Sequence, residues 1–183
     1  MYEELSIEVY SGSHYSTTYT ILGDVAVSFF DKDGKETGSC LIPKNHKLIK
    51  TYLKPFYHSG REGTGQFLYE GNQYKSFAYI NAPSKSYILF NDVDRNTESV
   101  KKGKITTISG VSDCDGYYYP VAPGNVMPDR DYVFGKPDGK HEHNLALFTV
   151  SDYDKNKNVY VTLKLVKESR HDKNVQLVWM QPQ

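Results

Sequence analysis

The sequence predicts an all-β fold, a single-domain antiparallel β-sandwich of roughly nine to eleven strands that spans residues 1–183. Apolar and polar residues alternate in many short segments, which is the pattern of half-buried strands. Gly, Asn, Asp and Pro separate these segments, and no longer window combines helical periodicity with a convincing cap. Aromatic residues make up 14% of the chain, mainly through 16 tyrosines, which favours strands over helices.

The N-terminal half contains a first strand and a hairpin. Apolar residues alternate with polar ones over residues 5–9, which predicts the strand. Apolar alternation over residues 25–29 and a return through residues 40–42 flank Asp33-Gly34, a dipeptide typical of tight hairpin turns. Four more segments fit strands: residues 46–53, 65–69, 74–80 and 86–90.

The C-terminal third predicts a hairpin and a last strand. Residues 143–150 and 159–166 flank a polar turn, and residues 174–180 alternate Val175, Leu177 and Trp179 as one set. The turn offers oxygen ligands over residues 152–158, but it lacks the glycine and the glutamate of a calcium-binding loop. A hairpin turn is therefore the favoured interpretation.

Residues 91–141 lie between these parts and are rich in Gly, Pro and Asp. A structureless loop of this length is uncommon in a compact domain, and a linker would not carry so many aromatic residues. The segment is expected to be a long irregular excursion, an ordered insertion on the face of the domain with two short strands.

The net charge limits the kinds of partner that are expected, and the N-terminal sequence limits the expected cellular location. Lys and Arg together number 22, as do Asp and Glu, so the net charge is zero and no nucleic-acid partner is expected. The N-terminus has neither a basic region nor an apolar core of a signal peptide. The expectation is cytoplasmic synthesis, followed by release through lysis or non-classical export.

Cysteine and histidine give few candidates for redox or metal chemistry. Whether Cys40 and Cys114 pair depends on the fold, and the sequence leaves this open. His141 and His143 would share one face of a strand, a spacing seen in some metal sites, but no second cluster completes a ligand set. A turn that enters a strand is the favoured interpretation, and no cofactor is expected.

No motif indicates catalysis. The sequence has no Gly-x-Ser-x-Gly elbow, and neither cysteine lies beside a base in sequence. The expectation is a protein that is not an enzyme.

The stronger candidates for function are aromatic residues of the 91–141 segment, whose rings can stack on sugars or hold a choline-like cation. They are Tyr117, Tyr118, Tyr119 and Tyr132. An equally weighted alternative is that these rings close the loop over the core.

The stretch GREGTGQFLYEG (residues 60–71) has four glycines, but a strand follows it, and the Gly-Lys-Ser/Thr of a phosphate-binding loop is absent. Its glycines, aromatic residues and turns resemble those of the aegerolysin family, and the likeness covers roughly residues 3–90. The residues that carry it are Gly60, Glu62, Gly63, Thr64, Phe67, Tyr69, Gly71, Asn72, Phe77, Tyr79 and Pro83.

The resemblance implies a small β-sandwich that binds membrane lipid head groups without catalysis. It also implies a role as one component of a pore-forming or insecticidal toxin pair, with a larger pore-forming protein as partner. Three alternatives stay open from the residues themselves: a self-assembling structural protein of an inclusion or phage, a lectin that binds a glycan surface, and a metal enzyme centred on His141 and His143. Homo-oligomers are compatible with the zero net charge.

Overall fold

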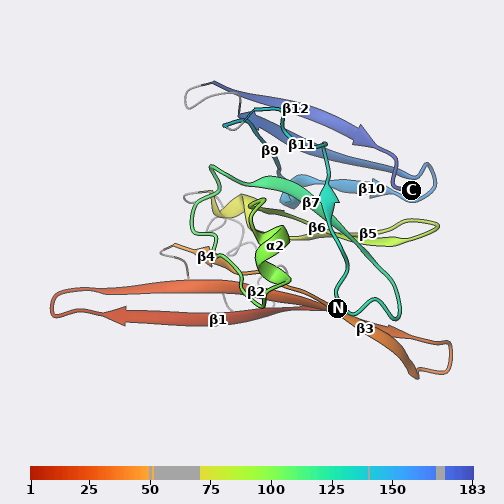
Figure 1. Ribbon diagram of the computed structural model, residues 1–183, viewed down its shortest axis with the longest axis horizontal. Helices are drawn as coiled ribbons and strands as arrows, with labels where there is room; N and C mark the ends of the chain where they lie inside the picture. The colour runs from red at the N-terminus through yellow and green to blue at the C-terminus, as the bar shows by residue number, and fades with distance from the viewer. Residues whose placement is uncertain (50, 52–70, 140, 168–171) are drawn as a thin grey trace.

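The computed structural model confirms the all-β prediction, with twelve strands in three antiparallel four-stranded sheets and one short α-helix among the described residues (Figure 1). The residues described are 1–49, 51, 71–139, 141–167 and 172–183. None of the helices in these ranges is long and apolar enough to cross a membrane.

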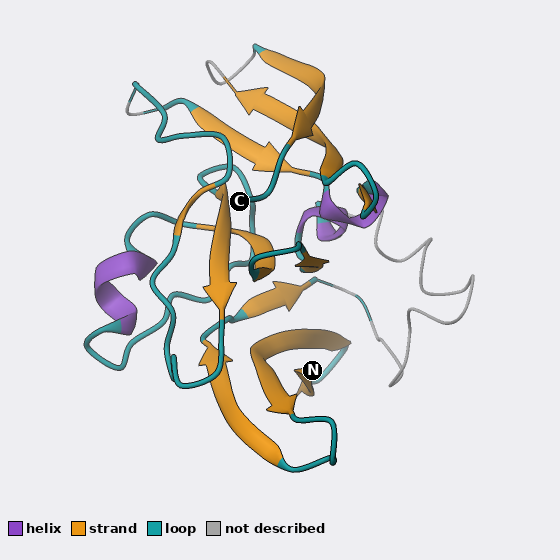
Figure 2. Ribbon diagram, turned by 90° about the vertical axis from the view of Figure 1, so that its right-hand side faces the viewer, coloured by secondary structure: helices purple, strands orange, loops and turns teal. Residues whose placement is uncertain are grey.

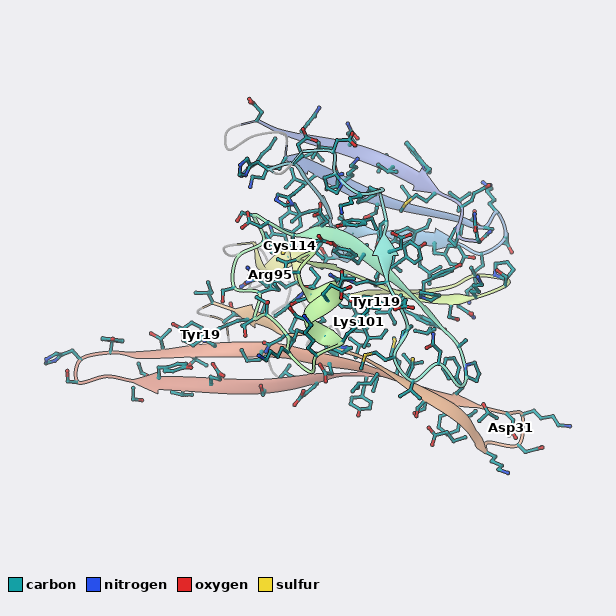
Figure 3. All side chains as sticks on the ribbon, viewed as in Figure 1. Tyr19, Asp31, Arg95, Lys101, Cys114 and Tyr119 are labelled. Carbon is teal, nitrogen blue, oxygen red and sulfur yellow. The ribbon has the colours of Figure 1, made fainter. Side chains whose placement is uncertain are left out.

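The N-terminal sheet is organised around the long strand β2 (Ser16–Phe30), which pairs with β1 (Tyr2–Ser11), β3 (Glu36–Ile42) and β4 (His46–Leu48). The β1–β2 hairpin extends from the body as a two-stranded ribbon, and the predicted β2–β3 hairpin projects at the opposite end (Figure 1). Asp31 begins its turn (Figure 3) and accepts two backbone N–H groups through its carboxylate.

The central sheet has the order β5 (Ala78–Asn81), β6 (Ser86–Asp92), β7 (Asp115–Val121) and β8 (Asp131–Tyr132). The short helix α2 (Asn96–Val100) connects β6 to β7 and lies outside the sheets (Figure 2). Strands β7 and β8 belong to the 91–141 segment, which was expected to be an insertion on the face of the domain. In the structure β7 pairs along its whole length with β6, so this part of the segment belongs to the central sheet.

The C-terminal sheet is organised around β11 (Val159–Lys167). Strands β9 (His143–Ala146) and β10 (Asp152–Asp154) pair with different parts of β11, and β12 (Lys173–Met180) pairs along its full length. The predicted strand over residues 143–150 is therefore interrupted, because Phe148–Val150 forms a 3₁₀ turn. The turn between β10 and β11 is a hairpin turn, as predicted.

The sheets stack in three layers, with the central sheet between the other two (Figure 1). One apolar cluster joins it to the N-terminal sheet and another joins it to the C-terminal sheet. Strand β6 alternates between them: Ile88 and Phe90 face the first cluster, and Tyr87 and Leu89 face the second. Burial on both faces explains why this strand is a nearly continuous apolar run.

Several sequence predictions concern residues 52–70, which lie outside the described residues. They include the strand over 65–69 and most of GREGTGQFLYEG. Its last glycine, Gly71, is described and has a φ of 79°, a left-handed conformation that favours glycine, where a 3₁₀ turn (Asn72–Tyr74) begins. Cys40 and Cys114 are both free and buried, and they lie in different apolar clusters.

A buried polar network joins β4 to the segment before β5. The ammonium of Lys75 donates to the carbonyls of Lys47 (2.6 Å) and Ser109 (2.7 Å) and to Oδ1 of Asn72 (3.1 Å). Nδ1 of His46 lies 3.0 Å from the carbonyl of Lys75, so this nitrogen carries the proton and donates. Nε2 of His46 is buried and has no hydrogen-bond partner among the residues that the structure describes. Burial, with the nearby charges of Lys44 and Lys75, holds the pKa of His46 well below its usual value of 6.5.

His46 makes stability fall at acidic pH. Below about pH 6.5 the unfolded chain binds a proton at this residue and the folded chain does not, so the free energy of unfolding decreases by up to about 1.4 kcal/mol per pH unit. Urea denaturation between neutral and mildly acidic pH measures this slope. His46→Asn keeps a donor for the Lys75 carbonyl and is expected to reduce the slope. His14→Asn, at an exposed turn, is the matched control and should keep it; an unchanged slope in His46→Asn would contradict the assignment.

Candidate ligand-binding cavity

A cavity of about 450 Å³ lies between the central and C-terminal sheets, within the size range of small-molecule sites. Four tyrosines from four different strands line it: Tyr87, Tyr118, Tyr132 and Tyr160. Apolar side chains complete much of the wall, namely Ile80, Leu89, Val133 and Met180. The residues after β12, 181–183, cross one side, where the Tyr87 hydroxyl donates to the backbone carbonyl of Gln183.

The alternation of β7 divides the tyrosine triplet between two environments. Tyr117 and Tyr119 face the cluster shared with the N-terminal sheet, whereas Tyr118 faces the opposite side and lines the cavity. Tyr118 lies opposite Leu89 of β6 and Asp131 of β8, so strands on both sides fix its position. The ring of Tyr87 meets that of Tyr118 edge to face, with centroids 5.8 Å apart.

Tyr160 and Lys85 supply polar groups to the wall of the cavity. Tyr160 is 2% exposed, and no described residue lies in good hydrogen-bond geometry with its hydroxyl, although the hydroxyls of Ser151 and Thr162 are near enough to act on its pKa. Burial raises the pKa of Tyr160 to about 12, against the lowering effect of those two hydroxyls, so Tyr160 stays protonated and can donate. Lys85, in the turn between β5 and β6, supplies an exposed ammonium group.

The four tyrosines singled out in the sequence do not form one exposed surface. Tyr118 and Tyr132 line the cavity, whereas Tyr117 and Tyr119 are 1% and 6% exposed, and Tyr119 lies deep between the sheets (Figure 3). Tyr117 and Tyr119 therefore cannot stack on an external ligand, and for these two the alternative of closing over the core describes the structure.

Arg130 stabilises the buried side chains of Tyr117 and Tyr119. Its guanidinium donates to the carboxylate of Asp92 at 2.5 Å, to the carbonyl of Val93 at 2.7 Å and to the hydroxyl of Thr97 at 2.8 Å. The same group stacks on the ring of Tyr117, 3.8 Å from its centroid. The side chains of Arg130 and Asp92 are 5% and 3% exposed, so this is a buried ion pair whose remaining polar positions are filled.

The tyrosine hydroxyls complete this cluster. Arg130 also donates to the hydroxyl of Tyr119 at 3.3 Å. The hydroxyl of Tyr132 donates to Asp94 at 2.7 Å, and its ring packs on Tyr117 with centroids 4.6 Å apart. Tyr132 thus belongs to both the Arg130 cluster and the cavity wall, and it couples the two.

The two histidines proposed as metal ligands are not brought into one ligand set. His141 lies in an exposed turn before β9, and His143 begins that strand. Nδ1 of His143 is 3.1 Å from the carboxylate of Asp115 and donates to it when protonated. In the ranges that the structure describes, no three His, Cys, Asp or Glu side chains are grouped to hold a metal ion. The segment is a turn that enters a strand, as the sequence favoured.

A second cavity, of about 480 Å³, lies beside β1 and β4 and is lined mainly by polar side chains. Its lysines are already paired: Lys44 lies 2.6 Å from Glu3, and Lys47 lies 3.1 Å from Glu8. The pairing of these charges leaves less for a ligand to gain than in the tyrosine-lined cavity.

Sequence reasoning missed Tyr87 and Tyr160 as members of the site. Both lie in segments that the sequence predicts as strands, and neither was singled out as a candidate ligand residue. Period-two alternation shows which neighbours share a face, but the pairing of distant strands decides which faces meet.

Comparisons with protein-family models, with curated proteins and with solved structures find no match to this chain.

The Arg130–Asp92 pair is expected to be essential for stability. Arg130→Met leaves a buried carboxylate without its partner and is expected to lower the free energy of unfolding by about 3–5 kcal/mol. Arg130→Met combined with Asp92→Leu removes both charges and is expected to recover at least about 1 kcal/mol of that loss. Urea denaturation of the three proteins measures both values.

The matched control is Lys101→Ala, which removes an exposed ion pair with Glu98 on α2. It is expected to change the free energy of unfolding by less than about 1 kcal/mol. A loss in Arg130→Met as small as that of the control would show that the buried pair does not hold this region together.

Proposed function

We propose that this protein is a non-enzymatic binding protein that takes a phosphocholine-type head group of a membrane lipid into the tyrosine-lined cavity. The observation that carries the proposal is the convergence of Tyr87, Tyr118, Tyr132 and Tyr160 on one space of about 450 Å³. The proposal agrees with the lipid-binding role that the aegerolysin resemblance implies.

The tyrosines suit the cationic end of such a head group. Quaternary ammonium groups are bound by aromatic rings through cation–π attraction, and their methyl groups pack against apolar walls such as Leu89 and Met180. Among the described residues that line the cavity, none is an Asp or a Glu. Attraction for the cation would therefore come from ring faces, which favour a diffuse, weakly hydrated charge over a small metal ion.

Two other groups suit the phosphate end. The ammonium of Lys85 is a point charge of the kind that binds phosphate, and the hydroxyl of Tyr160 is a donor without a partner in the wall. Filling that donor would remove the cost of a buried unsatisfied hydroxyl. A zwitterionic ligand with a quaternary ammonium and a phosphate matches both halves of the cavity better than a simple cation or anion does.

A sugar is the second candidate, because Gln181 and Gln183 add amide-bearing residues beside the tyrosines. Stacked rings with amide donors and acceptors suit a hydroxylated ligand. The larger pore-forming partner that the family resemblance implies belongs to the same proposal, with head-group binding as the targeting step.

Tyr118→Ala is expected to weaken phosphocholine binding at least about tenfold, because it removes one ring of the cage, worth about 1.4 kcal/mol or more. Isothermal titration calorimetry with free phosphocholine measures the dissociation constant. Tyr118→Phe keeps the ring and is the matched variant that should retain affinity. Tyr15→Ala removes a tyrosine that is 72% exposed on the β1–β2 hairpin and should have no effect.

Vesicle sedimentation extends the test to membranes. The protein is expected to bind vesicles of phosphatidylcholine and vesicles of sphingomyelin. It is expected to bind vesicles of phosphatidylethanolamine, and vesicles of phosphatidylglycerol, less strongly. No binding to either choline lipid, or equal binding to all four, would overturn the proposal. Competition by an oligosaccharide but not by phosphocholine would favour the lectin alternative.

A further inference from the structure

Strand β12 exposes a stripe of large apolar side chains. Val175, Leu177 and Trp179 are 60%, 52% and 64% exposed, and their spacing places all three on one face of the strand. Opposite them in β11 lie Leu165, Leu163 and Val161, which are half-buried and extend the apolar row on the same face, and Leu165 also packs against a core cluster. Isolated exposed apolar residues are common, but a continuous row on one face marks an interaction surface.

β12 is also an edge strand. Within the described chain its only pairing partner is β11, and it lies at the outer margin of the C-terminal sheet (Figure 1). Its second edge presents backbone N–H and C=O groups that another strand can pair with. From Asn174 to Met180 the strand has no charged residue and no proline, so it lacks the usual features that keep an edge strand from pairing.

We propose that β12 of a second copy of this chain pairs antiparallel with β12 about a two-fold axis. The two C-terminal sheets would then form one continuous sheet across the dimer. This inference concerns another surface than the tyrosine-lined cavity and does not depend on its ligand.

The sequence of β12 is self-complementary in one antiparallel register. Placing Leu177 opposite Leu177 of the second copy also places Val175 opposite Trp179, so the two apolar stripes join on one face. On the other face Gln176 meets Val178. A shift by one residue would instead place apolar side chains of one copy beside the polar face of the other.

Charge permits the same arrangement. The only charged residue of β12 is Lys173, at its beginning, and in this register the two copies of Lys173 lie at opposite ends of the paired strands. The chain as a whole has a net charge of zero, so two copies do not repel each other over long range. A partner of strong charge would find no complement on the strand, which favours a second copy.

Sedimentation equilibrium of the full chain tests the assembly. The dimer is expected to predominate once the chain concentration reaches about 100 μM. Leu177→Lys sets two like charges opposite each other and is expected to weaken dimerisation at least about tenfold. Val150→Lys changes a side chain that is 57% exposed outside β12 and should leave the dimer intact. A monomer at every concentration, or a dimer unaffected by Leu177→Lys, would overturn the proposal.

Cross-linking tests the register independently of stability. With diamide as the oxidant of the two thiols, Leu177→Cys is expected to form a disulfide-linked dimer, because position 177 faces itself. Trp179→Cys is the matched variant, and it should cross-link far less because Trp179 faces Val175. The native Cys40 and Cys114 are 3% and 0% exposed and supply little background. Equal cross-linking by both variants would contradict this register. A native chain that is monomeric at every concentration and that loses vesicle binding in Leu177→Lys would assign the stripe to a membrane instead.

Discussion

The fold depends on a central sheet that is buried on both faces. Strands β6 and β7 lie between two apolar clusters, so almost every side chain along them is removed from water. Such strands ordinarily consist of aliphatic residues, yet β7 places three tyrosines in succession at this position. Each tyrosine brings a hydroxyl into the interior, and each hydroxyl needs a partner. The rest of the structure can be understood from how the two sides of the sheet meet that need.

On the side toward the N-terminal sheet, a complete polar cluster supplies hydrogen-bond partners to the buried tyrosines. Arg130 stacks on the ring of Tyr117 and donates to the hydroxyl of Tyr119, and Asp92 balances its charge. Helix α2 adds Thr97 and Asn96 to the same cluster, since the Asn96 amide donates to Asp92 at 2.7 Å. The segment that the sequence presented as an irregular excursion is therefore what satisfies the polar groups of the core.

The side toward the C-terminal sheet is less complete, and a cavity is the result. The hydroxyl of Tyr160 has no well-placed hydrogen-bond partner in the part of the chain that the structure describes, and that of Tyr87 reaches the backbone of Gln183. The outer strands differ in a related way. On the β1–β2 ribbon, Lys47 stacks on the rings of Tyr10 and Tyr19 and pairs with Glu8, whereas the outer face of β12 has no such cover among the described residues. The two proposals concern the surfaces where polar or apolar groups lack partners within the described chain, namely the tyrosine-lined cavity and strand β12.

The sequence by itself determined many of the strands and turns, and the side of each such strand on which a residue lies, although Phe148–Val150 interrupts one predicted strand. Alternation in β1, β2 and β12, the Asp33-Gly34 turn and the hairpin before β11 all follow from local patterns, because side chains alternate with period two and turn residues act on their own backbone. The tertiary structure decided which faces meet. Tyr118 lines a cavity and Tyr117 is buried only because distant strands pair around them, and the place of Arg130 depends on Asp92, which is 38 residues away. Strand pairing over such separations is set by the packing of the whole core, and no local pattern contains it.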